Sequence, residues 1–326
     1  MTKKKAIRTL TLRRKRRTKS AQQQISYYDR QEGKMEHELI YGDGLLRFLY
    51  ESKRGQLLSG ILSHWLFSRL YGLYQNTTLS KKGIPSFVKK FHIKMEDYSE
   101  EVGKEFPYKN FNEFFIREFK KGARPFVKEK GLMPAFAEGK YLAYRSIAEN
   151  ESYFIKGKAM TIGDILKSSK WEKVFRDGPL FIARLCPVDY HRFHFPDDGE
   201  VLDYYKLKGK LHSVNPLALK KKKNIFAINE RQVTILETKN FGKLAYIEVG
   251  ALAVGKIKQT HLLEQPYKRG EEKGYFLFGG STVILIGESP SKGQGPRWLP
   301  DEDIIAMTKK KIETFIRLGE RVAHQQ

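Results

Sequence analysis

Short apolar runs separated by glycines fill the chain from about residue 132 to residue 287, and they constrain its fold more than any other feature. The runs are rich in β-branched and aromatic residues, which favour strands. Examples are "KYLAYRSI", "GPLFIARL", "FAINERQVTIL" and "KLAYIEVGALAVGKI", with a short helix expected at "TIGDIL". This pattern predicts a β-rich core.

One of these runs is interrupted in "FGGSTVILIG", residues 278–287. Gly279 and Gly280 break a good strand, although two glycines add backbone entropy and no side chain to pack. Taken alone, the stretch indicates a hairpin or a bulge. The polar pair that follows, Ser281 and Thr282, leaves a chemical role open.

Helical spacing of apolar residues is found on both sides of this core. Residues 36–125 read as helical, and the phenylalanines of "FNEFFIREFKKGARPF" form one stripe. Near the end of the chain, Pro300 and three acidic residues can cap a final helix. The apolar face expected for that helix consists of Ile304, Ile305, Ile312, Phe315, Ile316 and Val322.

The net charge of +24 predicts an anionic partner, either nucleic acid or an anionic lipid surface. The first 19 residues carry ten basic residues and no acidic one.

No segment has the ~20 apolar residues that a membrane span requires. Within residues 55–74, however, apolar residues recur at helical spacing around Trp65. This segment is interpreted either as a buried helix or as a helix lying in a membrane interface.

The densest cluster of polar residues is "CPVDYHRFHFPDDG", residues 186–199. His191 and His194 stand three residues apart, and two imidazoles near neutral pKa can serve separate proton transfers. No clear third ligand accompanies them, so no metal site is predicted. A histidine-rich turn held by hydrogen bonds is the structural alternative. Cys186, the single cysteine, is interpreted as a small buried residue.

Taken together, several stretches resemble the phosphatidylserine decarboxylases over about residues 36–322. In order along the chain they are "FNEFFIREFKKGARP", "CPVDYHRFHFPDDG", "LHSVNPLAL", "NERQVTIL", "VGALAVGKI", "GEEKGYFLFGGSTVIL" and "KKKIETFIRLGERV". The Gly-Gly-Ser-Thr form is similar to the branch often called type II. The resemblance implies an enzyme of phospholipid biosynthesis, a carboxy-lyase that converts phosphatidylserine to phosphatidylethanolamine and CO2.

The resemblance also gives the glycine pair a chemical role. It implies that the hydroxyl of Ser281 attacks the carbonyl carbon of Gly280, and that an N→O acyl shift gives an ester. Elimination then leaves Gly280 as a new C-terminus, and hydrolysis converts residue 281 into a pyruvoyl group. That covalent cofactor forms a Schiff base with the substrate amine and accepts the electrons released with CO2. The hydroxyl needs a general base with an orienting carboxylate.

Four residues carry the implied catalytic roles, and no metal is required. Ser281 is the pyruvoyl precursor, His194 matches the histidine that activates it, and His191 matches the histidine of the decarboxylation step. The orienting carboxylate is assigned to Glu138 in "MPAFAEGKYLAY", although the family normally has aspartate there. The alternatives for that acid are Asp189, Asp197 and Asp198.

The predicted fold class is therefore α+β, with a β-rich catalytic core, an N-terminal helical membrane-associating region and a C-terminal helix. The predicted division is a flexible basic arm over 1–30, the helical region over 31–130 and the catalytic region over 131–326. Cleavage would give a beta chain, 1–280, and an alpha chain, 281–326, that stay associated. A peripheral location at the cytoplasmic side of the cell membrane is expected, and a homo-oligomer is left open.

Two other classes of protein compete with this interpretation. A nucleic-acid-binding protein would explain the basic arm, but the body lacks the motifs of common RNA-binding modules, so no nucleic acid is expected. A pseudoenzyme of the same fold would explain the departure at Glu138 from the family's aspartate.

Overall fold

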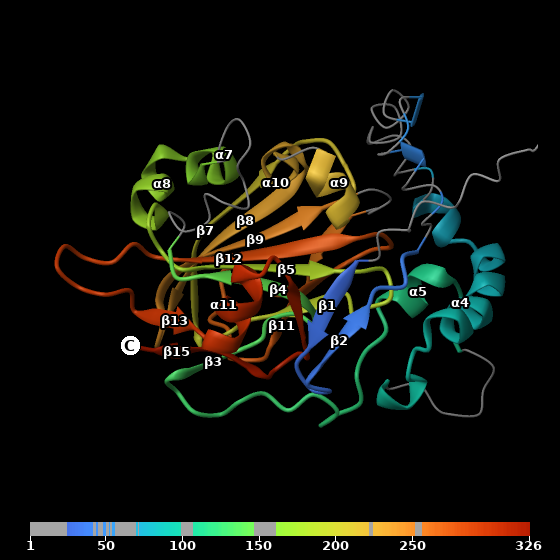
Figure 1. Cartoon of the computed structure of the whole chain (residues 1–326), viewed down its shortest axis with the longest axis horizontal. Helices are drawn as coiled ribbons and strands as arrows, with labels where there is room; N and C mark the ends of the chain where they lie inside the picture. Colours follow the sequence, from blue (N-terminus) through green and yellow to red (C-terminus); the bar gives the residue numbers. More distant parts are fainter. Residues whose placement is uncertain are drawn as a thin grey trace, which may run out of the picture.

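The structure is a computed structural model, and most of the chain folds around one large sheet (Figure 1). It describes residues 25–41, 44, 48–49, 52, 54–55, 70, 72–98, 107–146, 161–221, 224–251 and 256–326.

The large sheet has nine strands and forms the core of the protein. They are β1 Ser26–Asp29, β2 Lys34–His37, β4 Gly139–Tyr144, β5 Leu180–Leu185, β7 Gly199–Leu207, β8 Arg231–Thr238, β9 Gly242–Gly250, β12 Ser281–Gly287 and β14 Glu313–Ile316. Their order in the sheet is β2-β1-β14-β4-β5-β12-β9-β8-β7. Neighbouring strands are antiparallel, except that β1 and β14 run parallel. The prediction of a β-rich core is confirmed.

Two smaller sheets complete the β structure. One contains β6 Arg192–His194, β10 Ile257–Gln259 and β11 Glu272–Phe276, in the order β10-β11-β6. The other contains β3 Leu132–Pro134, β13 Trp298–Pro300 and β15 Arg321–Gln325, in the order β13-β15-β3. The first of these sheets joins the histidine segment to the strand that precedes the glycine pair.

The middle strands of the large sheet are covered on both faces. Every residue of β5 and of β12 is buried. A strand buried on both faces reads as a continuous apolar run rather than an alternating one. In the register of the sheet, Ile284 of β12 lies between Ile182 of β5 and Ile247 of β9. The apolar run after the glycine pair therefore fixes β12 at the centre of the core.

Short helices lie against this core. They are α7 Ile162–Leu166, α8 Ser169–Phe175, α9 Pro216–Lys221, α10 Ile225–Ile228 and α11 Glu302–Lys309. The helix expected at "TIGDIL" is confirmed as α7, and a capping box between Thr161 and Asp164 starts it. Helix α11 packs on β4, where the Ala143 amide donates to the Thr308 hydroxyl at 3.0 Å.

The N-terminal helical elements lie at the end of the molecule away from the C-terminus (Figure 1). They are η1 Thr78–Gly83, α4 Ile84–Phe91, η2 Met95–Asp97 and α5 Phe111–Phe115. An aromatic cluster holds α4 and α5 together, and Phe278, the residue before the glycine pair, belongs to it. The buried members are Ile84, Phe87, Tyr108, Phe111, Phe114, Phe115 and Phe278.

The prediction of one C-terminal helix that reaches Val322 is wrong beyond α11. The helix ends at Lys309, and Lys311 has a φ of 61°, in the left-handed region that an α-helix does not enter. The chain then forms β14 and β15. Helical spacing of the apolar residues is misleading here, because Ile316 and Val322 are instead buried as residues of β14 and β15.

The single stripe of phenylalanines predicted for "FNEFFIREF" is also shorter than expected. Helix α5 ends at Phe115, and Phe119 lies in an isolated bridge with Tyr98. The ring centroids of Phe119 lie 4.8 Å from Tyr98 and 4.3 Å from Tyr190. These tertiary contacts stabilise a non-helical conformation of the chain after Ile116.

A hairpin of β1 and β2 occupies residues 26–37, which the sequence assigns to the end of the arm and the start of the helical region. Its turn is fixed by Arg30, which pairs with Asp301 at 2.8 Å and with Asp303 at 2.7 Å. A short polar hairpin is marginal alone, so its pairing with β14 stabilises it.

The predicted membrane-associating segments fall mainly outside the described residues, which begin at residue 25 and leave out residues 56–69. Within the described parts of the chain, no helix combines the length and the apolar character needed to cross a bilayer.

Candidate functional site

Ser281 is the first residue of β12 and is fully buried. Its main chain lies between Leu185 of β5 and Gly250 of β9. Just before it, Gly279 has a φ of 140°, a conformation that favours glycine. Gly279, the first residue of the pair, is therefore the position whose backbone conformation favours glycine. Ser281 lies in a strand at the centre of the sheet.

His191 is the imidazole that contacts Ser281. Its Nδ1 lies 3.3 Å from the Ser281 Oγ, and its Nε2 lies 2.8 Å from the Cys186 carbonyl oxygen. Because a carbonyl only accepts, Nε2 carries the proton and Nδ1 is free to accept from the serine hydroxyl. The ring stacks on Phe115 with centroids 3.9 Å apart. Burial lowers the pKa of His191 to about 3, so the ring is neutral at pH 7.

The turn that precedes His191 is held from two sides. On one side the Asp189 carboxylate accepts from the Cys186 amide at 2.7 Å and pairs with Lys140 at 3.4 Å. On the other side Arg117 donates to the Val188 carbonyl at 3.0 Å. Asp189, one of the alternatives for the orienting acid, therefore acts on His191 only through the main chain.

His194 lies apart from the serine contact. Its Nδ1 lies 3.0 Å from the Gly270 carbonyl oxygen, so Nδ1 carries the proton, and its Nε2 lies 3.4 Å from the Tyr190 hydroxyl. Burial lowers the pKa of His194 to about 4. The ring is neutral at pH 7 and has a basic nitrogen, but that nitrogen faces Tyr190.

Glu138 is buried and its carboxylate is engaged by other groups. Arg124 donates to it through Nε at 2.6 Å and through Nη2 at 3.1 Å, and the Leu318 amide donates at 3.1 Å. The serine–histidine–glutamate arrangement implied by the resemblance is thus not assembled in the uncut chain. Glu138 instead joins the turn before β4 to the segment between β14 and β15.

The two remaining candidates for the orienting acid hold loops. Asp197 pairs with Arg269 at 3.0 Å and accepts from the side chain of Asn240 at 2.8 Å. Asp198 accepts from the main-chain amide of Arg269 at 3.0 Å. Both carboxylates are therefore occupied in structural roles.

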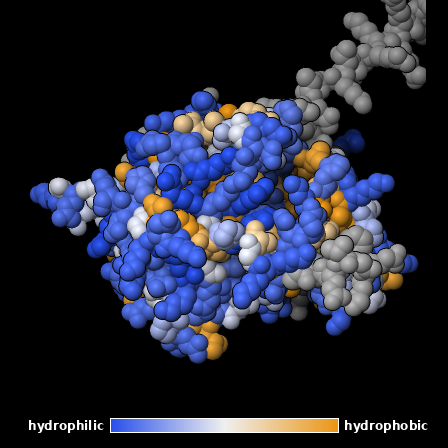
Figure 2. Space-filling view, turned by 90° about the horizontal axis from the view of Figure 1, so that it is seen from below, coloured by the Kyte–Doolittle hydropathy of each residue, from blue (hydrophilic) through white to orange (hydrophobic). Residues whose placement is uncertain are grey.

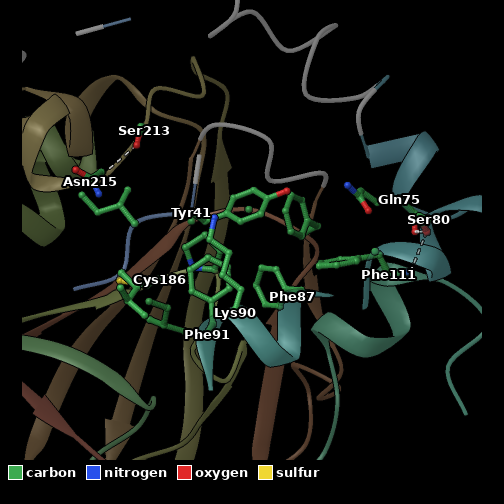
Figure 3. Close-up of a pocket in the computed structure, with 18 of the residues that line it drawn as sticks. Tyr41, Gln75, Ser80, Phe87, Lys90, Phe91, Phe111, Cys186, Ser213 and Asn215 are labelled. Carbon is green, nitrogen blue, oxygen red and sulfur yellow. Dashed lines mark hydrogen bonds between the residues drawn. The ribbon is translucent and has the colours of Figure 1, made fainter. Parts of the chain in front are cut away.

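A pocket of about 840 Å³ opens beside the glycine pair, between the N-terminal helices and the sheet (Figure 3). Its wall contains Gly279, Gly280 and Cys186, so it reaches the peptide bond before Ser281. Aromatic side chains make up much of the rest of the wall. They are Tyr41, Tyr74, Phe87, Phe91, Phe111 and Phe278. The site therefore combines a buried serine–histidine pair with a large, mainly apolar cavity.

Sequence reasoning missed several residues of this site. Arg117 and Lys140 read as ordinary members of a helix and a strand, and only their burial shows that they support the histidine turn. Tyr41 and Lys90 line the pocket from segments with no functional motif.

Among the residues that the structure describes, no group of histidine, cysteine and carboxylate side chains is arranged to hold a metal ion. The thiol of Cys186 lies 2.9 Å from Arg184 Nη1, and burial raises its pKa. The reactive group with a base beside it is therefore Ser281.

Comparisons with known proteins agree with this geometry. A family model described as phosphatidylserine decarboxylase matches residues 111–323. The chain is 39% identical over 305 residues to the phosphatidylserine decarboxylase proenzyme of Fusobacterium nucleatum, covering 93% of this chain and 99% of that protein. It is 37% identical to the phosphatidylserine decarboxylase proenzyme of Clostridium tetani, covering 91% of this chain and 97% of that protein. It is also 37% identical to the proenzyme of Chlamydia pneumoniae, covering 93% of this chain and 98% of that protein. The chain belongs to the phosphatidylserine decarboxylase family.

Proposed function

We propose that this phosphatidylserine decarboxylase cuts itself between Gly280 and Ser281 and works at the pocket beside that bond. The enzyme carries a covalently bound pyruvoyl group and makes phosphatidylethanolamine. One observation carries the proposal for the site: a buried serine, 3.3 Å from an uncharged imidazole, directly follows two glycines that line a mainly apolar cavity. Release of CO2 from phosphatidylserine by purified protein tests it, and protein that binds only nucleic acid would contradict it.

The surroundings of residue 281 fit a pyruvoyl group. Gly280 has room, since a Cβ there would meet only the Val214 side chain at 3.7 Å. Both glycines line the pocket, so a ketone at residue 281 would lie where the pocket meets β12. Bound there, the group supplies a carbonyl that takes the substrate amine and the electrons released with CO2.

The residues around this centre move protons and exclude water. His191 is the proposed proton carrier of decarboxylation, and its contact with Ser281 supports a place at the reacting atoms. The Nδ1 that faces residue 281 is unprotonated, so it first accepts a proton, which the substrate ammonium can supply, and then donates it to the substrate carbon. The contact of His191 with Cys186 fixes the tautomer. His194 is the proposed base of self-cleavage, as the family resemblance implies. Its Nε2 is unprotonated, but the ring has to leave Tyr190 to serve. The aromatic wall keeps water from the reacting carbon.

The fold supports continued association of the two chains after cleavage. The proposed alpha chain, 281–326, begins with β12 between β5 and β9 and later places β14 between β1 and β4. Two of its strands are therefore inserted between strands of the beta chain. Separation would break the four ladders of these two strands and the ladder between β15 and β3 as well, so the cleaved enzyme should stay one particle.

The proposed effect of Glu138 on self-cleavage can be separated from the effect of its ion pair with Arg124 on stability. We expect Glu138→Gln to slow self-cleavage, because the proposed orienting charge is lost. In a Ser281→Ala chain, which stays uncut, it should also lower the free energy of unfolding by about 1.5–3 kcal/mol, because the hydrogen bonds to charged Arg124 weaken. Urea unfolding and a time course of synthesis measure the two effects.

Arg124→Gln is the matched control, because it breaks the same ion pair and keeps the carboxylate of Glu138. The control also loses the pair between Arg124 and Asp97 at 3.1 Å, so it should lose at least as much stability but cleave faster than Glu138→Gln. Equal cleavage rates in the two variants would show that Glu138 acts only by holding the fold.

We also propose that the enzyme is a peripheral membrane protein at the cytoplasmic side of the cell membrane. Large apolar side chains are exposed near the pocket, with Leu73 57%, Tyr74 50% and Leu79 63% exposed. Figure 2 shows hydrophobic patches on an otherwise hydrophilic face, several of them on the side where α4 and α5 lie. A lipid substrate would enter the pocket from such a surface.

Deleting residues 1–24 is expected to weaken binding to anionic liposomes mainly at low salt. The deletion removes ten basic residues, and each contributes about 1 kcal/mol when it lies near an anionic surface. Salt screens this attraction. Liposome co-sedimentation across a salt series measures it, with neutral liposomes as the control. Equal binding of the intact and shortened chains at low salt would contradict the electrostatic role.

A further inference from the structure

The pocket beside the reactive bond carries an excess of positive charge. Among its described lining residues Glu38 is the single carboxylate, whereas Lys82, Lys90 and Arg184 are cations. Arg184 is neutralised within the protein, because it pairs with the buried Glu38 at 2.6 Å and with a second buried glutamate. Neither lysine forms an ion pair with a described carboxylate. Two positive charges in the pocket are therefore left for a ligand.

Lys90 lines the pocket from α4, although the residue as a whole is exposed to solvent. The pocket-facing stripe of this helix recurs at helical spacing and consists of Gly83, Ser86, Phe87, Lys90 and Phe91. The Lys90 ammonium lies 5.3 Å from the centroid of the Phe91 ring. Figure 3 shows Lys90 among the lining side chains, near Phe91 and Tyr41.

Ring contacts connect this lysine to the reactive bond. The Tyr41 ring lies 6.1 Å from Phe91 and 5.7 Å from Phe278, centroid to centroid. Phe278 comes directly before the glycine pair. The cation and the bond to be cut thus lie on one continuous aromatic wall.

The substrate brings an anion, its phosphodiester, into this pocket. In phosphatidylserine, only the β-carbon and one ester oxygen separate the phosphorus from the α-carbon that loses CO2. When the amine is held at residue 281, the phosphodiester is therefore in the same pocket. A phosphate oxygen and an ammonium make a charge-assisted hydrogen bond.

We propose that Lys90 binds the phosphodiester of phosphatidylserine and so makes the enzyme prefer a phospholipid to other serine derivatives. The inference rests on the proposed reactive centre at Ser281. The competing explanation is that Lys90 only balances the negative C-terminal end of α4. Lys89 shares that last turn but does not line the pocket, so it is the matched control.

The test uses the cleaved full-length enzyme and monomeric dihexanoyl-phosphatidylserine, so that binding to a membrane surface does not enter. Lys90→Ala should raise KM about tenfold or more, as expected for loss of one hydrogen bond between charged groups. Lys90→Arg should restore most of the affinity. Lys89→Ala should match the wild type. Equal effects at the two positions would overturn the proposal.

O-octylserine, which has the amino acid and an alkyl chain but no phosphate, provides the second arm. The wild-type preference for the phospholipid over this ether should largely disappear in Lys90→Ala. An equal loss of activity on both compounds would show a general defect and overturn the proposal. Inorganic phosphate should compete only weakly, and competition as tight as the lipid's own KM would assign Lys90 to free phosphate instead. A wild-type enzyme inactive on the phospholipid would refute both this proposal and the reactive centre.

Discussion

Replacing Ser281 by alanine is expected to leave one uncut chain of 326 residues without decarboxylase activity. The hydroxyl is both the attacking group of self-cleavage and the source of the ketone, so no later step can compensate for its loss. The wild-type enzyme should instead give two chains, 1–280 and 281–326, with the second blocked at its N-terminus by pyruvoyl. Intact mass measurement and a CO2 assay distinguish the two outcomes.

The neighbouring threonine provides a matched control. Thr282 is fully buried beside Ser281, and its hydroxyl has no hydrogen-bond partner among the described residues. Thr282→Val keeps the shape and removes the hydroxyl, so the variant should still cut itself and decarboxylate. Recovery of active, uncut Ser281→Ala would refute the proposed cleavage. An inactive Thr282→Val would show that loss of a buried hydroxyl alone disturbs this strand.

Under native conditions the cut enzyme should elute at the size of the whole protein, and it should separate into two chains only on denaturation. The reason is the position of β12 and β14 inside the large sheet, each between two strands of the other chain. Release of the short chain under native conditions would contradict this interleaved arrangement.

The β core could be predicted from the sequence because its middle strands are buried on both faces. Such strands leave a continuous apolar signature, as in "LFIARL" and "STVILIG". The hairpin of β1 and β2 has no such signature. Its sequences, "SYYD" and "KMEH", are short and partly polar, and its stability comes from pairing with β14 and from the Arg30 ion pairs. Contacts between distant segments of this kind are not visible in a local pattern.

The C-terminal segment shows how one apolar pattern can satisfy two structures. Ile312, Ile316 and Val322 suit the face of a helix, yet β14 and β15 bury two of them in sheets. The sequence carried one contrary signal, the three lysines at 309–311, where the helix stops. Tertiary pairing outweighs helix propensity, which amounts to a few tenths of a kcal/mol per residue for most residue types.

The chemical groups of the site could be predicted, whereas their contacts could not. Of the histidines and the glutamate assigned to Ser281, the structure brings His191 into contact with it, whereas the places of His194 and Glu138 at the reacting atoms stay predictions. A motif does not tell which imidazole faces the serine. The orientation of His191 depends on the Cys186 carbonyl and on buried charges that support the turn. Those are main-chain and long-range interactions, for which the sequence has no local signature.

Replacing His191 by alanine is expected to lower decarboxylation by about 10²–10⁴-fold, the usual contribution of a general acid or base. The ring touches the residue that becomes the cofactor, and its loss removes proton delivery to the substrate carbon. His191→Gln is the structural control, because its amide can still donate to the Cys186 carbonyl but cannot transfer a proton at pH 7. Activity near the wild-type level in either variant would contradict the proposed role.

The cleavage of these variants tests the division of labour between the two histidines. We expect His191→Ala to cut itself at least in part and His194→Ala to remain one chain, because His194 is the proposed base. The Nε2 contact of His194 with the Tyr190 hydroxyl is long at 3.4 Å and therefore weak, but its Nδ1 also donates to the Gly270 carbonyl at 3.0 Å, so the ring has to break both contacts to serve as the base. Against this assignment stands the 3.3 Å contact between His191 and Ser281 in the uncut chain. If His191→Ala stays uncut and His194→Ala is cut, that contact is the one between nucleophile and base, and His191 serves both steps.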